Sequence, residues 1–306
     1  MSRRCALLVL LALIAGCGDD QPRSDVPAPA PAERDSPGTA DASGTTPSIG
    51  SIAVDPQDGT LIIGTGLGLF RLALGAKLAE PIEGELVTPE ASGAVSANLV
   101  LCFIGPRTLV ASGHPEGGSA LPENLGLIRS EDGGEAWKPL SLLGEADLHA
   151  LDARGDRVAG QPAGEARLLV SDDGGRSFEE RTPPAAPIDV DLDPAQPERM
   201  VIATADGIFV SADAGATWRQ RDVLTVEARL AWSEDGSLYR VEAGGSVKLS
   251  KDGGANWSET GRIDGSPTAV AADARGRLYV ALGGGVLKRS DDRGRTFSRI
   301  TRLTIP

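Results

Sequence analysis

The stretch Ser130–Trp137 reads SEDGGEAW, and it is the first of five related octapeptides that decide the fold of this chain. The other four are SDDGGRSF at 171–178, SADAGATW at 211–218, SKDGGANW at 250–257 and SDDRGRTF at 290–297. Their consensus is Ser-x-Asp-x-Gly-x-(Thr/Ser/Asn)-(Trp/Phe). The central aspartates recur at steps of 41, 40, 39 and 40 residues, at Asp132, Asp173, Asp213, Asp252 and Asp292. A fixed period of this length indicates a repeat architecture.

Each octapeptide has the chemistry of a tight turn between two β-type runs. Glycine adopts the positive φ that such a turn needs, and a short carboxylate accepts hydrogen bonds from nearby backbone N–H groups. The closing aromatic residue is large enough to anchor the outgoing strand on the sheet. We expect the five aspartates to hold turns, because five copies spread around one molecule cannot all line a single site.

The rest of each repeat predicts further strands. In the fourth unit, residues 188–192 alternate between apolar and acidic, and residues 200–204 form an apolar run. Residues 207–210 lead into the octapeptide at 211–218, whose last two residues begin a further run, 217–221. Four antiparallel strands in about 40 residues are typical of one β-propeller blade. No sustained helical periodicity is present beyond the N-terminus.

We count six such units in residues 49–306 and predict an all-β propeller of six four-stranded blades. Leu74 replaces the aspartate of the first unit, and the second unit, about 85–141, carries an insertion from His114 to Asn124. The later units begin near residues 145, 186, 225 and 265. A seventh short blade, or a strand exchange at ring closure, stays open.

The first 16 residues have the features of an export signal. Arg3 and Arg4 are followed by an apolar run, residues 6–15, which is short for a membrane span and ends in Ile-Ala-Gly-Cys at 14–17. This end resembles the lipobox of bacterial lipoproteins, which implies cleavage after residue 16 and acylation of Cys17. The alternative is an uncleaved anchor with an incidental cysteine.

Residues 17–48 are therefore expected to be the lipidated Cys17 and a disordered tether rich in Pro and Ala. The protein would then be an exported, membrane-anchored lipoprotein of the bacterial cell envelope, facing the periplasm or the cell surface. It would reach the membrane through its N-terminal lipid only.

Cysteine content and charge limit the function classes. Once Cys5 is removed and Cys17 is acylated, only Cys102 remains, so no internal disulfide can form. Loss of Arg3 and Arg4 leaves 28 basic against 43 acidic residues, a net charge of −15. This acidity argues against nucleic-acid partners.

The octapeptides resemble the Asp-box, or BNR, repeats of sialidases, sortilin-type receptors and photosystem II assembly-factor-like propellers. The lipobox, together with residues 111–115, 125–128 and 142–151, is similar to exported bacterial BNR propellers commonly labelled sialidase-like or glycosyl-hydrolase-like. The resemblance covers about residues 49–306. It implies a propeller fold and, as a label, exo-α-sialidase-like glycoside hydrolysis.

The residues that sialidase chemistry requires are not found in the sequence. That chemistry needs three arginines on the substrate carboxylate, a tyrosine nucleophile activated by a glutamate, and an aspartate acid/base. The expected inner strands carry one arginine, Arg229, and no Arg-Ile-Pro motif occurs near residue 49. Tyr239 and Tyr279 occupy equivalent positions in successive units, which indicates packing. The sequence therefore favours a non-catalytic protein, with no catalytic residue assigned.

Candidate binding residues come from the expected inner strands of units three to five, where polar residues alternate on one strand face. They are Asp147, His149, Asp189, Asp191, Glu227 and Arg229. Because innermost strands surround the channel of a propeller, these side chains could converge near one opening. Three interpretations stay open: a solvated rim with pairs such as Glu227–Arg229, a calcium or zinc site, or a carboxylate pair for hydrolysis.

His114 is a further candidate, since it lies where a strand enters the inserted loop between Gly113 and Pro115. Proteins that this chain resembles also have histidines at the start of the first unit, where this chain has Pro47-Ser48-Ile49-Gly50. We therefore assign no metal ligand or cofactor and expect no stoichiometric transition metal.

The sequence thus predicts a monomeric binding or assembly scaffold, with an envelope protein or a glycan as partner. The face that carries the insertion from His114 to Asn124, together with the channel rim, is the expected binding face. The alternative is a sialidase-like glycoside hydrolase acting on glycans.

Overall fold

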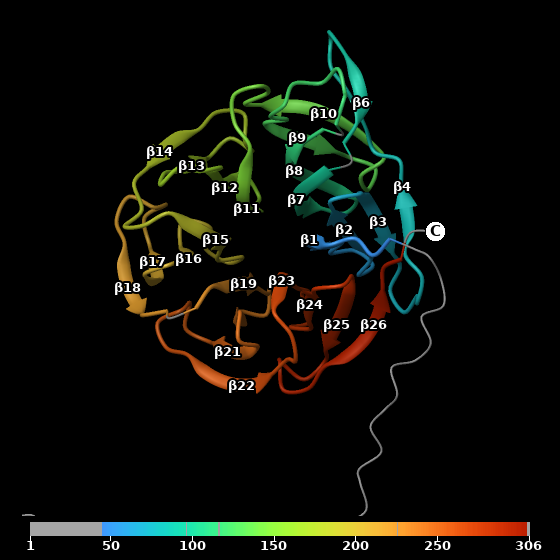
Figure 1. The fold of residues 1–306 in the computed structure, drawn as a ribbon. Helices are drawn as coiled ribbons and strands as arrows, with labels where there is room; N and C mark the ends of the chain where they lie inside the picture. Colours follow the sequence, from blue (N-terminus) through green and yellow to red (C-terminus); the bar gives the residue numbers. More distant parts are fainter. Residues whose placement is uncertain (1–44, 96, 116, 225, 305–306) are drawn as a thin grey trace, which may run out of the picture. The chain divides into compact units, whose positions relative to one another are not determined.

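The computed structural model describes residues 45–95, 97–115, 117–224 and 226–304. The predicted signal peptide, Cys17 and nearly all of the tether lie outside these residues. The described residues form six β-sheets, which follow one another around a ring (Figure 1). No described helix has the length and apolar character needed to cross a bilayer.

Five blades are four-stranded antiparallel sheets whose strands follow sequence order from the channel outward. Blade 1 consists of β1 (Ile49–Val54), β2 (Leu61–Thr65), β3 (Gly68–Leu72) and β4 (Glu80–Ile82). Blade 3 consists of β11 (Leu148–Arg154), β12 (Arg157–Pro162), β13 (Leu168–Ser171) and β14 (Glu179–Arg181). Blade 4 consists of β15 (Pro187–Leu192), β16 (Met200–Thr204), β17 (Gly207–Ser211) and β18 (Arg219–Asp222).

The last two blades repeat this plan. Blade 5 consists of β19 (Ala228–Trp232), β20 (Leu238–Glu242), β21 (Ser246–Ser250) and β22 (Ser258–Arg262). Blade 6 consists of β23 (Pro267–Ala272), β24 (Leu278–Leu282), β25 (Val286–Ser290) and β26 (Ser298–Arg302). The prediction of a six-bladed propeller is confirmed.

Blade 2 has the same four strands and an added hairpin. Its core is β7 (Ala97–Gly105), β8 (Thr108–His114), β9 (Leu127–Ser130) and β10 (Ala136–Ser141). The hairpin of β5 (Glu85–Val87) and β6 (Ser92–Ala94) extends the sheet beyond β10, and β5 pairs with β10 in parallel. The length of the second unit therefore comes from an outer hairpin as well as from the predicted insertion between β8 and β9.

The ring closes by packing rather than by strand exchange within the described residues. Each of the six sheets is built from one continuous segment of the chain. Ile49 of blade 1 shares a buried apolar cluster with Tyr279 and Leu303, at the other end of the propeller sequence. Thr301 Oγ1 donates a hydrogen bond to the carbonyl of Lys77 at 2.7 Å.

The repeated octapeptides are hydrogen-bonded turns between the third and fourth strands of their blades. In blade 4, Ser211 Oγ donates to Asp213 Oδ1 at 2.8 Å and accepts from the Gly215 N–H at 2.9 Å. Thr217 donates to Asp213 from both its N–H and its hydroxyl. The same serine–aspartate contact recurs in the other four turns. The expectation that these aspartates hold turns agrees with this geometry.

The hydrogen bonds lower the pKa of the turn aspartates below the usual range. The hydroxyl of the residue four positions later is the largest cause at Asp173, Asp213 and Asp292, and the pKa of Asp292 falls to about 2. Asn256 has the same role for Asp252. This contact explains why the consensus has a Thr, Ser or Asn at its seventh position.

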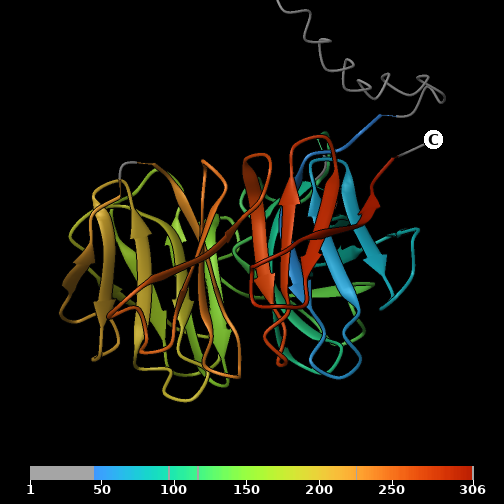
Figure 2. The ribbon, with the colours of Figure 1, turned by 90° about the horizontal axis from the view of Figure 1, so that it is seen from below.

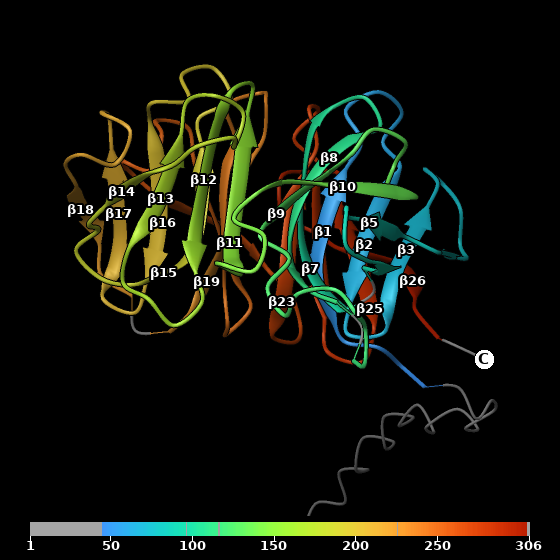
Figure 3. The ribbon, with the colours of Figure 1, turned by 90° about the horizontal axis from the view of Figure 1, so that it is seen from above.

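The strands of each blade run between two opposite faces of the ring, which Figures 2 and 3 show from the side. The octapeptide turns lie on the same face as the β-turns between first and second strands, since Gly133 N–H bonds to the Arg107 carbonyl and Gly174 N–H to that of Asp156. We call this the turn face. The opposite face, where the innermost strands begin, carries the loop between β8 and β9, and we call it the entry face.

Candidate functional site

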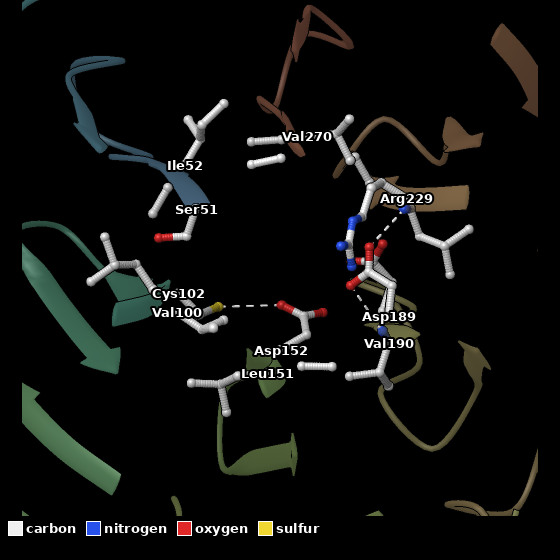
Figure 4. A pocket seen from close by; sticks show the side chains of 18 of the residues that line it. Ser51, Ile52, Val100, Cys102, Leu151, Asp152, Asp189, Val190, Arg229 and Val270 are labelled. Carbon is white, nitrogen blue, oxygen red and sulfur yellow. Dashed lines mark hydrogen bonds between the residues drawn. The ribbon is translucent and has the colours of Figure 1, made fainter. Parts of the chain in front are cut away.

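The six innermost strands surround a channel that contains a cavity of about 220 Å³ (Figure 4). Strands β1, β7 and β23 contribute mainly small or apolar side chains to it. Strands β11, β15 and β19 contribute the charged ones: Asp152, Arg154, Asp189, Asp191 and Arg229. The charged side chains of the channel are thus confined to one arc of the ring.

Asp152 and Arg154 of β11 form one half of this charged arc. Asp152 Oδ2 accepts the backbone N–H of Leu192 at 2.8 Å, and its Oδ1 lies 3.1 Å from Arg154 Nη1. The buried thiol of Cys102 donates to the same Oδ1 at 3.2 Å. Sequence reasoning missed Asp152 and Arg154, although they alternate along β11 as the aspartates of β15 do.

Asp189 of β15 pairs with the next blade. Its Oδ2 accepts the N–H of Leu230 at 2.8 Å, and its Oδ1 accepts the N–H of Val190 at 3.0 Å. Burial raises the pKa of Asp189 to about 6, although the positive charge of Arg229 and the two backbone donors act in the opposite direction. Arg229 Nη1 donates to the Ile188 carbonyl at 3.0 Å.

Asp191 is a further buried carboxyl group of the channel. Its side chain is buried, and Oδ2 has no hydrogen-bond partner among the described residues. Burial, followed by the nearby charges of Asp152 and Asp189, raises its pKa well above the usual range. Three carboxyl groups face two guanidinium groups here, so uptake of a proton by the cluster relieves repulsion.

A second polar cluster lies where the entry face meets the channel. Asp147 precedes β11 and is buried, and the Nε2 atoms of His114 and His149 each lie 2.8 Å from its Oδ2. His114 comes from the end of β8 in the neighbouring blade. The structure therefore unites His114, a separate candidate in the sequence, with Asp147 and His149, which the sequence had paired on one strand face.

Glu227 does not join either cluster. Its side chain is exposed, and its carbonyl accepts a hydrogen bond from the Ala243 N–H. Arg229 faces Asp189 and Ile188 instead of Glu227. The six inner-strand candidates are thus divided: Asp147 and His149 lie at the mouth, Asp189, Asp191 and Arg229 lie within the channel, and Glu227 lies outside it.

The two tyrosines are blade-packing residues. Both are almost completely buried at equivalent positions of β20 and β24. Tyr239 donates its hydroxyl to the Gly276 carbonyl at 2.7 Å, and burial raises its pKa to about 12. Neither tyrosine lines the channel cavity.

These observations define the class of the protein as a six-bladed β-propeller with a charged channel and a His–Asp–His cluster at its mouth. No protein-family model matches the sequence, and no curated protein matches it at a significant level. Many solved structures share the fold.

YCF48 from Cyanidioschyzon merolae aligns over 83% of this chain and 85% of its own, with 15% identity and a TM-score of 0.52. A structure of YCF48 bound to D1 peptide aligns over 83% and 81%, with 17% identity and a TM-score of 0.51. The GH74 enzyme of Niastella koreensis aligns over 84% of this chain but 46% of its own, with 15% identity and a TM-score of 0.54. At these identities the likeness shows the fold alone.

Proposed function

We propose that this protein is a binding scaffold of the bacterial cell envelope, held at the membrane by a lipid on Cys17, and that its entry face receives another envelope protein. The observation that carries the proposal is the anchored loop between β8 and β9. Leu121 and Leu125 bury their side chains in the core of blade 2, while Gly118, Ala120 and Glu123 stay exposed between and beside them.

A loop fixed in this way presents its exposed residues in one arrangement, which lowers the entropy cost of binding. The Asn124 carbonyl accepts the Gly144 N–H at 2.8 Å, and the Gly113 carbonyl accepts the Leu125 N–H at 3.0 Å. The loop is therefore tied both to its own blade and to the connection into blade 3. The structure of YCF48 with D1 peptide supports peptide recognition by a propeller of this shape.

Site-specific photo-crosslinking in living cells tests the scaffold. A photo-reactive residue at Ala120, on the entry face, should yield a reproducible protein adduct. The matched control is the same residue at Ala212, an exposed alanine on the turn face. Equal adducts from both positions, or none from Ala120, would contradict the proposal.

Acylation and location are tested separately. Metabolic labelling with an alkyne fatty acid should modify the wild-type protein, and Cys17→Ser should abolish the label and release the protein from membranes. Protease treatment of intact cells then distinguishes the cell surface from the periplasm. A labelled Cys17→Ser variant would overturn the anchor without affecting the binding face.

A glycoside hydrolase is the second candidate, and the raised pKa of Asp189 beside Asp191 favours it. Of two neighbouring carboxyl groups with raised pKa values, the protonated one can act as a general acid while the ionised one acts as base or nucleophile. A panel of fluorogenic sialosides and other glycosides decides the matter. Turnover that is abolished by Asp189→Asn would establish catalysis and displace the scaffold proposal.

A further inference from the structure

The chain contains two histidines, His114 and His149, and both direct a ring nitrogen at one buried carboxylate. Their donor atoms and those of Asp147 all lie within 4.8 Å of one another. The two imidazoles come from different blades, so local sequence does not bring them together. The arrangement is independent of the scaffold proposed above.

The contacts at Asp147 lack the geometry of hydrogen bonds. Both Nε2 atoms lie 2.8 Å from Oδ2, yet neither carboxylate oxygen has a partner in hydrogen-bond geometry among the described residues. The Asp147 side chain is only 4% exposed. A buried carboxylate without directed donors is costly unless a cation compensates it.

The tautomer of His114 strengthens this point. Its Nδ1 lies 2.8 Å from the Glu123 carbonyl oxygen, which can only accept a hydrogen bond. Nδ1 therefore carries the proton, and in a neutral ring Nε2 presents its lone pair to Asp147. Two lone pairs that face each other at this distance repel, so the contact requires either a second proton on the ring or a metal ion between the two atoms. A backbone carbonyl on the far ring nitrogen is also the usual orienting contact of a metal-bound histidine.

The segments that carry the three donors are held by backbone hydrogen bonds. Leu148 N–H donates to Ser112 Oγ at 2.8 Å, which fixes the start of β11 against the end of β8. The Asp147 carbonyl accepts the Ala163 N–H at 2.8 Å, and the Ala146 carbonyl accepts the Gly126 N–H at 3.1 Å. The donors are thus pre-positioned on both sides of the blade junction.

We propose that His114, Asp147 and His149 bind a divalent transition-metal ion, zinc or iron(II), at the entry-face mouth of the channel. Two imidazole nitrogens and one carboxylate suit these ions, whereas calcium and magnesium require a shell of oxygen ligands. This proposal replaces the sequence-based expectation that no transition metal is bound.

Small movements bring the donors to coordinating positions. Ligands about 2.0–2.1 Å from a tetrahedral ion lie about 3.3 Å apart, so the 2.8 Å separations need to widen by about half an ångström. The His149 side chain is 60% exposed and free to make that adjustment. Three protein ligands leave a coordination position open for water or another ligand, and His149 also lines the channel cavity.

Elemental analysis and calorimetry test the site on the full chain, purified without a polyhistidine tag. We expect one metal ion per chain, with mass spectrometry distinguishing zinc from iron. After chelation, Zn²⁺ should rebind and raise Tm. His149→Gln and His114→Gln should each weaken Zn²⁺ binding at least about tenfold. Glu131→Gln, a change at an exposed carboxylate of the turn face, is the control and should bind like wild type.

Asp147→Asn should also weaken Zn²⁺ binding, and two further readouts keep the test decisive if that variant fails to fold. Co²⁺ should give visible ligand-field bands that His149→Gln removes. Nuclear magnetic resonance should show both imidazole rings shifting when Zn²⁺ is added. Zn²⁺ binding that is unchanged in both histidine variants, binding of Ca²⁺ alone, or rings that stay unshifted at one equivalent of Zn²⁺ would overturn the proposal.

Discussion

Asp189 of blade 4 accepts the backbone N–H of Leu230 in blade 5 at 2.8 Å, and so joins two blades at the wall of the channel. Asp152 makes the same contact with Leu192 one blade earlier. Adjacent sheets of a propeller are not joined by backbone hydrogen bonds. Each carboxylate therefore accepts an N–H of the neighbouring innermost strand that has no backbone carbonyl to bond to. The charged residues of the channel therefore join adjacent blades and also line the cavity.

Stability should rise as the pH falls from about 7 to about 5. The pKa of Asp189 is raised to about 6 and that of Asp191 is also raised, so the folded protein takes up protons that the unfolded chain, with carboxyl pKa values near 4, does not. Thermal unfolding across this window measures the effect. Asp189→Asn should flatten the dependence, and a Tm that falls equally in both proteins would contradict it.

Below about pH 4 the trend should reverse. The turn aspartates have lowered pKa values, about 2 for Asp292, so the stabilisation that their carboxylates provide is lost as the pH falls toward that value.

Asp191→Asn should stabilise the protein at neutral pH. The substitution keeps the shape of the buried side chain and removes a negative charge next to Asp152 and Asp189. It also replaces the unpartnered Oδ2 atom by part of a neutral amide, so no charge has to be buried there. We expect Tm to rise by about 2–4 °C, which corresponds to about 1 kcal/mol for a domain of this size. A lower Tm at pH 7.5 would show that the Asp191 charge is needed by Arg154.

Ser211→Ala should destabilise blade 4. The serine hydroxyl accepts the buried N–H of Gly215 and donates to Asp213, so its loss leaves a backbone donor without a partner. We expect a cost of about 1–3 kcal/mol in the free energy of unfolding, measured by urea denaturation. Ser298→Ala, at an exposed serine, should stay within about 0.5 kcal/mol of wild type. Equal effects would show that the turn hydrogen bonds contribute nothing specific.

Tyr239→Phe should cost more than Tyr279→Phe. The Tyr239 hydroxyl donates to the Gly276 carbonyl of the next blade at 2.7 Å, whereas that of Tyr279 lies 3.5 Å from Asp273 Oδ2. We expect a loss of about 1 kcal/mol for the first and less for the second. Denaturation of the two variants side by side measures the difference. A loss of any glycoside turnover in Tyr239→Phe, without a loss of stability, would instead indicate a chemical role.

Cys102 should resist alkylation in the folded protein. Its thiol is 7% exposed, and burial together with the negative charge of Asp152 raises its pKa far above the usual range, so very little thiolate forms. Iodoacetamide treatment followed by peptide mapping should find Cys102 unmodified in native protein and modified in urea. Rapid labelling of native protein would mean that the channel wall opens.

The sequence by itself determined the repeat, the six blades and the role of the five turn aspartates, because each turn is held by contacts within one octapeptide and the octapeptides recur at a nearly fixed period. Ser211, Asp213 and Thr217 bond to one another, so their spacing along the chain carries the whole signal. The sequence also marked Asp189, Asp191 and Arg229 as inner-strand residues. It could not separate them from Glu227, which lies just before β19, has an exposed side chain and does not line the cavity.

Only the tertiary structure decided which polar residues meet. His114 and His149 belong to different blades, and the junction of blades 2 and 3 places the Nε2 atoms of both 2.8 Å from Asp147 Oδ2. Asp152 and Arg154 acquire their roles from Cys102 and Leu192 on neighbouring blades. Such contacts depend on how each sheet is rotated against the next, and that rotation is set by packing of the apolar clusters between blades, which no local pattern encodes.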